Sequence, residues 1–214
     1  MGANESFFID GPAGRLEALL MLPDGPPVAA ALVCHADPAQ GGVMHFKVVF
    51  RAAKALQSRG LAALRFNFRG VGLSEGVHDE GRGEQDDVRA ALGALERRFP
   101  GLPPVLGGFS FGASMALHVG VADSRAGALF ALGLPLLRMG DLRWMDDCRK
   151  PRLFVQGESD AFGDASAIEA FVGRLPEPRS LVVVPGADHF FEGRLDALQD
   201  AVAAWAAQRP WEAR

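Results

Sequence analysis

Short apolar runs of strand length alternate along the chain with amphipathic stretches of helical spacing. The predicted strands cover residues 6–9, 15–22, 28–34, 61–66, 104–107, 127–132, 152–156 and 181–184. The predicted helices cover residues 46–59, 84–99, 113–121, 165–174 and 195–208. Strands that alternate with helices predict a mostly parallel sheet with right-handed crossovers. The first two strands, separated by Gly11 and Gly14, predict an antiparallel start.

The most informative motif follows directly on the apolar run of residues 104–107. Residues 108–112 read G-F-S-F-G, which matches the pattern G-x-S-x-G. In that pattern the serine lies on a sharp turn from a strand into a helix, and the flanking glycines let the helix approach the strand closely. The N-terminal N–H groups of the helix then point back toward the serine. We therefore interpret Ser110 as a candidate nucleophile.

A serine hydroxyl is a weak nucleophile at its ordinary pKa, so this interpretation requires a general base and a group that orients the base. Asp160 lies just past the predicted strand at residues 152–156, and His189 follows the strand at residues 181–184. The order Ser110, Asp160, His189 is the order expected on an α/β-hydrolase scaffold. We expect the three side chains to meet where the parallel strands end.

Other interpretations of these residues stay open. Glu158 and Asp164 are alternative acids, and Asp160 is preferred for its position after the strand. Taken singly, a serine, an aspartate or a histidine at such positions is often an ordinary turn, capping or loop residue. His118 lies two turns along the predicted helix from Ser110, and we expect it to point away from the site in a packing or surface role.

Composition narrows the class of protein. The 22 basic and 26 acidic residues give a net charge of −4, so the chain has no general basic field for nucleic acid. No apolar run approaches the roughly 18 residues of a membrane span. Cys34 and Cys148 are too few for a disulfide framework, and Cys34 is expected to be a buried, inert thiol. Residues 1–10 lack the pattern of a secretion signal, so we expect a single cytoplasmic domain over residues 1–214.

Two further segments accompany the G-F-S-F-G motif: R-F-N-F-R-G-V-G-L-S-E-G at residues 65–76 and G-A-D-H-F-F at residues 186–191. Together they resemble a family of small bacterial α/β-hydrolases that is related in fold to dienelactone hydrolases and acyl-peptide hydrolase domains. The resemblance extends from about residue 7 to residue 205 and implies an eight-stranded sheet carrying the triad described above. Dienelactone hydrolases usually carry cysteine at the elbow, so the serine here argues against their chemistry.

Acyl transfer also needs hydrogen-bond donors for the developing oxyanion. The first candidate is the N–H of Phe111, directly after the serine. In the loop after the third strand, the family resemblance aligns His35 with the usual histidine and implies the N–H of Asp37 or Ala36 as the second donor. The family's loop more often reads His-Pro-His-Pro, whereas this chain reads H-A-D-P. We expect the Asp37 carboxylate to point outward or to cap the following turn.

The connection between the sixth and seventh strands is where such enzymes carry lids. Residues 133–150 leave room for one short helix around residues 142–148, so we expect no large cap domain and a shallow, partly open pocket. The glycine-rich loop at residues 70–83 is a candidate mobile rim. Candidate pocket residues, with ordinary core packing as the alternative, are Phe111, Leu136, Leu137, Met139, Trp144, Phe162 and Phe190.

These features predict a serine hydrolase that cleaves carboxylic esters or thioesters of small acyl groups through an acyl-enzyme on Ser110. We expect no metal or organic cofactor, a small-molecule ester or thioester as partner, and no nucleic-acid or membrane partner. The same triad would also serve a peptidase or an acyltransferase. A catalytically silent α/β-hydrolase scaffold used for binding is the alternative from another class. The sequence leaves the oligomeric state open.

Overall fold

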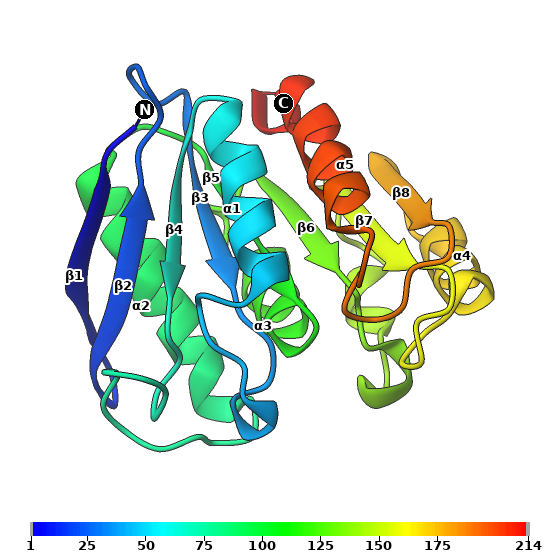
Figure 1. The fold of residues 1–214 in the computed structure, drawn as a ribbon, viewed down its shortest axis with the longest axis horizontal. Helices are drawn as coiled ribbons and strands as arrows, with labels where there is room; N and C mark the ends of the chain where they lie inside the picture. Colours follow the sequence, from blue (N-terminus) through cyan, green and yellow to red (C-terminus); the bar gives the residue numbers. More distant parts are fainter. Residues whose placement is uncertain (1, 213–214) are drawn as a thin grey trace.

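Eight strands form one sheet in the computed structural model, which describes residues 2–212 (Figure 1). The strands are β1 (Asn4–Gly11), β2 (Gly14–Met21), β3 (Ala29–Cys34), β4 (Leu61–Phe66), β5 (Pro104–Phe109), β6 (Ala128–Leu132), β7 (Arg152–Gly157) and β8 (Arg179–Val184). Their order across the sheet is β1-β2-β4-β3-β5-β6-β7-β8. β2 pairs antiparallel with β1 and with β4, and the remaining pairs are parallel. The predicted eight-stranded, mostly parallel sheet with an antiparallel start is therefore confirmed.

Five helices longer than one turn pack on the two faces of this sheet within residues 2–212 (Figure 1). They are α1 (Lys47–Ser58), α2 (Arg82–Arg98), α3 (Phe111–Ala122), α4 (Ala165–Arg174) and α5 (Leu195–Ala207). α1 and α5 cover one face, and α2, α3 and α4 cover the other. The central strands β3, β4 and β5 are buried along their whole length, which explains why they read as continuous apolar runs. None of the helices in the described part of the chain is long and apolar enough to cross a membrane.

The connection after β6 differs from the prediction. Two short 3₁₀ turns, Leu136–Arg138 and Arg143–Met145, replace the single helix expected around residues 142–148. Gly140 separates them with a φ of 65°, a left-handed conformation that glycine adopts without strain. The connection adds no cap domain, as the sequence predicted. The carboxyl ends of the parallel strands, where sites of such sheets lie, are therefore not covered by a separate layer.

Candidate active site

The turn from β5 into α3 holds Ser110 in a strained conformation. Its φ of 56° and ψ of −119° fall in a region that residues with a side chain rarely adopt. A Cβ atom at Gly108 would lie 2.6 Å from the carbonyl oxygen of Cys34, and one at Gly112 would lie 2.3 Å from that of His35. Only glycine fits at both positions, which lets α3 start close against β3. The serine is thereby held at the tip of the turn.

The structure brings Ser110, Asp160 and His189 into one hydrogen-bonded chain. Nε2 of His189 lies 2.9 Å from Oγ of Ser110, and Nδ1 of His189 lies 2.8 Å from Oδ2 of Asp160. Because a carboxylate only accepts, Nδ1 carries the proton and Nε2 is left to accept the serine proton. Asp160 and His189 are 2% and 5% exposed, so water does not compete for the bond between them. The three residues come from the loops after β5, β7 and β8.

The two alternative acids lie elsewhere and have other partners. Oε2 of Glu158 accepts a hydrogen bond from the backbone N–H of Gly186 at 2.8 Å. Asp164 caps the N-terminus of α4, where its Oδ1 accepts from the N–H of Ala167 at 3.0 Å. Among the three candidate acids, Asp160 is thus the residue hydrogen-bonded to His189.

Gln156 orients this acid, a role that the sequence analysis missed. Its fully buried Nε2 donates to Oδ2 of Asp160 at 2.9 Å and to the carbonyl of Gly163 at 2.7 Å. Its Oε1 accepts from the N–H of Leu134 at 2.9 Å, which ties the loop after β6 to the loop after β7. The N–H of Phe162 donates to the other carboxylate oxygen of Asp160 at 2.8 Å. The available signal was a polar residue that follows the apolar residues Leu153, Phe154 and Val155 within a buried strand.

The candidate oxyanion donors are backbone N–H groups from two segments, the start of α3 and the loop after β3. Phe111 is the first residue of α3, so its N–H has no acceptor within the helix. The loop after β3 carries the other two candidate donors, the N–H groups of Ala36 and Asp37, which donate no backbone hydrogen bond within the described chain. The Asp37 carboxylate caps the following turn, accepting from the N–H of Ala39 at 2.9 Å and from Nε2 of Gln40 at 3.3 Å. This capping matches the expectation from the sequence.

The buried side chain of His35 holds the loop after β3 in place through two hydrogen bonds. It is fully buried, its Nδ1 donates to the carbonyl of Ala36 at 2.6 Å, and its Nε2 accepts from the N–H of Phe68 at 3.0 Å. Burial lowers the pKa of His35 to about 4. The ring is therefore neutral at pH 7 and joins the loop after β3 to the loop after β4.

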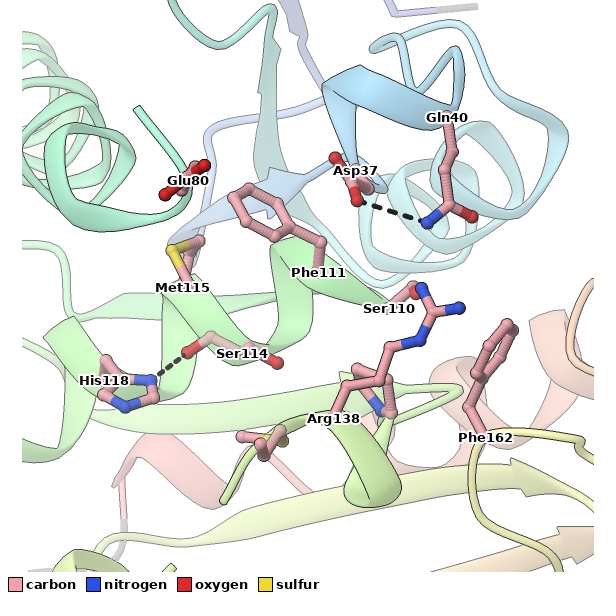
Figure 2. Close-up of a pocket in the computed structure, with 12 residues that line it drawn as sticks. Asp37, Gln40, Glu80, Ser110, Phe111, Ser114, Met115, His118, Arg138 and Phe162 are labelled. Carbon is pink, nitrogen blue, oxygen red and sulfur yellow. Dashed lines mark hydrogen bonds between the residues drawn. The ribbon is translucent and has the colours of Figure 1, made fainter. Parts of the chain in front are cut away.

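A cavity of about 230 Å³ opens beside Ser110 (Figure 2). Its lining residues are Asp37, Gln40, Glu80, Ser110, Phe111, Ser114, Met115, His118, Pro135, Arg138, Met139 and Phe162. Phe111, Met139 and Phe162 were predicted in this role. Leu136, Leu137, Trp144 and Phe190 were also predicted, but the structure does not place them in the cavity wall.

The misplaced residues follow from the path of the chain after β6. Leu136 and Trp144 pack against the core on the α3 side of the sheet, and Leu137 is 75% exposed. Phe190 is half exposed, and its ring lies 5.2 Å from that of His189 without lining the cavity. From the 3₁₀ turn Leu136–Arg138, where no helix was expected, Arg138 lines the cavity together with the predicted Met139.

The prediction that His118 points away from the site is wrong. His118 lines the cavity, and its Nδ1 is hydrogen-bonded to the carbonyl of Ser114 at 2.8 Å (Figure 2). Its ring stacks on Trp144 with centroids 4.1 Å apart. Helix positions 110, 114 and 118 fall on one face, since each step of four residues is close to one turn. This four-residue spacing could have predicted that His118 lies on the same side of the helix as Ser110.

The glycine-rich loop at residues 70–83 borders the cavity through Glu80. Its end is tied down by Glu84, which is fully buried at the start of α2. The Glu84 carboxylate accepts from the N–H of Gly81 at 2.8 Å and is hydrogen-bonded to Nδ1 of His78 at 2.8 Å. That this loop is a mobile rim stays a prediction. Any movement would have to involve loop residues that precede His78, the first residue held by these hydrogen bonds.

Cys34 is buried at the end of β3 with no exposed surface. Burial and the charge of Asp87 raise the pKa of its thiol. The thiol is therefore protonated at pH 7 and unreactive, as the sequence analysis expected.

Comparison with known proteins agrees with this fold. Residues 30–208 match the family described as "Alpha/beta hydrolase domain", and the chain belongs to that family. An α/β serine hydrolase homologue from Coxiella burnetii is 38% identical and superimposes with a TM-score of 0.88 over 95% of this chain and 98% of that one. A serine hydrolase without lid from Xanthomonas campestris is 34% identical, with a TM-score of 0.86 over 99% of this chain and 96% of that one.

A relative from Rickettsia prowazekii, described as an uncharacterized protein, is 33% identical over 91% of this chain and 85% of its own length. The expected resemblance to small lidless bacterial α/β-hydrolases is confirmed by the family match and by the structural neighbours. The protein is thus a lidless α/β-hydrolase, and the family supports a hydrolase without identifying its substrate.

Proposed function

We propose that this protein is a serine hydrolase that cleaves carboxylic esters or thioesters of small acyl groups through an acyl-enzyme on Ser110. The observation that carries the proposal is the hydrogen-bonded chain from Oγ of Ser110 through His189 to the buried Asp160. This chain ends at the mouth of a cavity, where a substrate carbonyl has room beside the serine. A serine so activated and accessible is the requirement of acyl transfer.

In the proposed reaction, Oγ of Ser110 attacks the acyl carbon while Nε2 of His189 takes its proton. Asp160 holds the imidazole in the required tautomer and stabilises its charged form. The N–H of Phe111, with that of Asp37 or Ala36, donates to the oxyanion. His189 then returns the proton to the leaving alcohol or thiol. Water hydrolyses the acyl-enzyme by the same route, and these steps need no metal or organic cofactor.

The size of the cavity supports a small acyl group. Its volume is about 230 Å³, and no cap domain adds apolar cover above it. The apolar part of the wall includes Phe111, Met115 and Met139. We therefore expect activity on acyl chains of roughly two to six carbons, without activation at a lipid interface. A preference for long-chain emulsified lipids would contradict this part of the proposal.

Labelling with a fluorophosphonate probe, together with hydrolysis of p-nitrophenyl esters of graded length, tests the proposal. Wild type should be labelled and active, and Ser110→Ala should lose both properties. Ser114→Ala is the matched control, because Ser114 lines the same cavity one helical turn away. Iodoacetamide should leave activity unchanged, since Cys34 is buried.

Four outcomes would contradict the proposal. A folded wild type that neither reacts with the probe nor hydrolyses any ester would favour the binding scaffold. Labelling that persists in Ser110→Ala would place the nucleophile elsewhere. Turnover of peptides in preference to esters would favour a peptidase with the same triad, and transfer to an added alcohol in preference to water would favour an acyltransferase.

A further inference from the structure

One charged side chain in the cavity wall has no ionic partner. Arg138 ends the 3₁₀ turn after β6 and lines the cavity. Figure 2 shows its side chain directed toward Ser110 and Phe162, with Glu80 on the far side of the cavity beyond Met115. Among the described residues Arg138 forms no ion pair and donates no side-chain hydrogen bond, so its guanidinium donors are open to a ligand.

The guanidinium is nevertheless held in place by an aromatic ring. Its central carbon lies 4.1 Å from the centroid of the Phe162 ring, which is the geometry of a cation–π contact. The Phe162 ring in turn packs edge-on against the ring of His189, with centroids 4.6 Å apart. Phe162 therefore links the position of Arg138 to that of the proposed general base. A positioned guanidinium loses less conformational freedom on binding than a free one.

The acidic groups of the cavity already have partners. The Asp37 carboxylate accepts from the N–H of Ala39 and from the side chain of Gln40. Glu80 lies 3.8 Å from the guanidinium of Arg82. Among the described residues, Arg138 is thus the ionised side chain of the cavity wall whose side-chain hydrogen-bond donors have no partner, so it is the group there that is open to a ligand anion.

Arg143, in the same connection after β6, is an arginine that does have an ionic partner. Its guanidinium donates to both carboxylate oxygens of Asp141, at distances from 2.7 to 3.1 Å. It does not line the cavity. The two arginines differ in partner and direction, so Arg143 provides a matched control for Arg138.

We propose that Arg138 determines specificity by binding an anionic oxygen group of the substrate, a carboxylate or a phosphate, close to the scissile acyl bond. This inference rests on the proposed function, because it names the substrate class of the same site. The planar guanidinium fork matches two oxygens of such a group with parallel hydrogen bonds. The favoured substrates are then esters that carry a negative charge on the acyl or the leaving-group side.

Matched pairs of esters test the charge preference. The acyl arm compares mono-p-nitrophenyl glutarate with p-nitrophenyl valerate. The leaving-group arms compare 3-acetoxybenzoate and 3-acetoxyphenyl phosphate with phenyl acetate, which separates carboxylate from phosphate. In at least one arm the anionic member should show a kcat/KM about tenfold higher than its neutral partner, after correction for the uncatalysed rates.

Variants and salt then assign the preference to Arg138. Arg138→Gln should abolish the anionic-to-neutral ratio, mainly by raising KM for the anionic ester, because the contact is to a group remote from the reacting atoms. Arg143→Gln should keep the ratio. In the wild type, potassium chloride at 0.5 M should lower the anionic-to-neutral ratio of kcat/KM, because the cavity is open to solvent and salt screens the contact.

The outcomes separate the inference from the proposed function. Hydrolysis of neutral esters with no charge preference in any arm, or a preference that survives in Arg138→Gln, overturns the inference alone. If no ester is hydrolysed, the proposed function fails, and an NMR titration with monomethyl glutarate still decides the inference. Binding to wild type that is lost in Arg138→Gln supports the anion site, and equal binding to both or to neither overturns it.

Discussion

The two sides of the cavity beside Ser110 are built in different ways. On one side, Asp160 and His189 are buried, hydrogen-bonded at both ends and supported by the fully buried Gln156. On the other side, Leu137 and Arg138 of the 3₁₀ turn Leu136–Arg138 are exposed, and the Arg138 side chain forms no hydrogen bond within the described chain. The buried hydrogen bonds keep the geometry of the proposed triad fixed. Substitutions in the exposed turn change the cavity wall at little cost in stability. We therefore expect substitutions on the buried side to affect rate and stability and those on the turn to affect selectivity.

The largest effect is expected from the serine and the histidine. Ser110→Ala and His189→Ala should each lower kcat on a short p-nitrophenyl ester by roughly 10⁵-fold, because the residues act as a unit. The double variant should be little worse than either single variant. Near-additive losses in steady-state kinetics, in proteins with unchanged circular dichroism, would show that the two residues do not work together.

The choice of acid should produce the next largest effect. Asp160→Asn should lower kcat by roughly 10³ to 10⁴-fold, since an amide favours the wrong imidazole tautomer. Asp164→Asn and Glu158→Gln are the controls and should retain activity, because both carboxylates bond backbone N–H groups away from His189. An active Asp160→Asn beside an inactive control would show that another acid orients the histidine.

The close packing at the elbow predicts a large stability difference between two helical glycines. Gly112→Ala would place a methyl 2.3 Å from the carbonyl of His35 and should destabilise the fold by about 3 kcal/mol or more. Gly173→Ala, in α4, meets nothing within 4 Å and should stabilise it by about 0.5 kcal/mol. Urea unfolding measures both changes. Similar effects of the two substitutions would argue against the tight approach of α3 to β3.

The buried neutral His35 predicts a dependence of stability on pH. Its pKa is lowered to about 4 in the folded protein, whereas it is about 6.5 in the unfolded chain. As the pH falls, the unfolded state therefore takes up a proton on His35 before the folded state does. The stability that the neutral His35 contributes is fully present above pH 6.5. It is lost as the pH falls from 6.5 to 4, which lowers the free energy of unfolding by about 3 kcal/mol. Urea unfolding between pH 7 and pH 4 should show a smaller loss for His35→Gln than for wild type. Parallel pH profiles would contradict a buried, neutral ring.

The smallest effect is expected in the cavity wall. Met139→Ala enlarges the apolar part of the wall and should shift the preferred acyl chain to a longer one, with kcat/KM changes below about tenfold. The panel of p-nitrophenyl esters measures this shift. A loss comparable to that of Asp160→Asn would mean that the turn after β6 belongs to the catalytic machinery, and the contrast between the two sides would disappear.

Much of the buried side could be predicted from local patterns. The apolar runs located the strands, and the glycines around Ser110 identified the elbow, because steric demands there act between near neighbours in the sequence. The order of Ser110, Asp160 and His189 pointed to residues that the structure brings within hydrogen-bond distance. The support from Gln156 escaped prediction, since its partners come from two other loops.

The cavity wall was predicted less well. Leu136, Trp144 and Phe190 were expected in it, while Arg138 and the inward direction of His118 were missed. In place of the helix expected around residues 142–148 the connection forms two 3₁₀ turns separated by Gly140, and Arg138 at the end of the first turn lines the cavity. Short loops follow the surfaces on which they pack, so their side-chain directions are not a local property.

The sequence by itself indicated the fold class and the turn at Ser110, because apolar periodicity and glycine spacing act over a few residues. The order of Ser110, Asp160 and His189 along the chain pointed to His189 as the candidate base. The tertiary structure decided that Asp160, rather than Glu158 or Asp164, meets His189. It also decided which side chains face the cavity, and that Arg138 lies there without an ionic partner among residues 2–212. These outcomes depend on where separate strands end relative to one another, and that relation exists only once the sheet has formed.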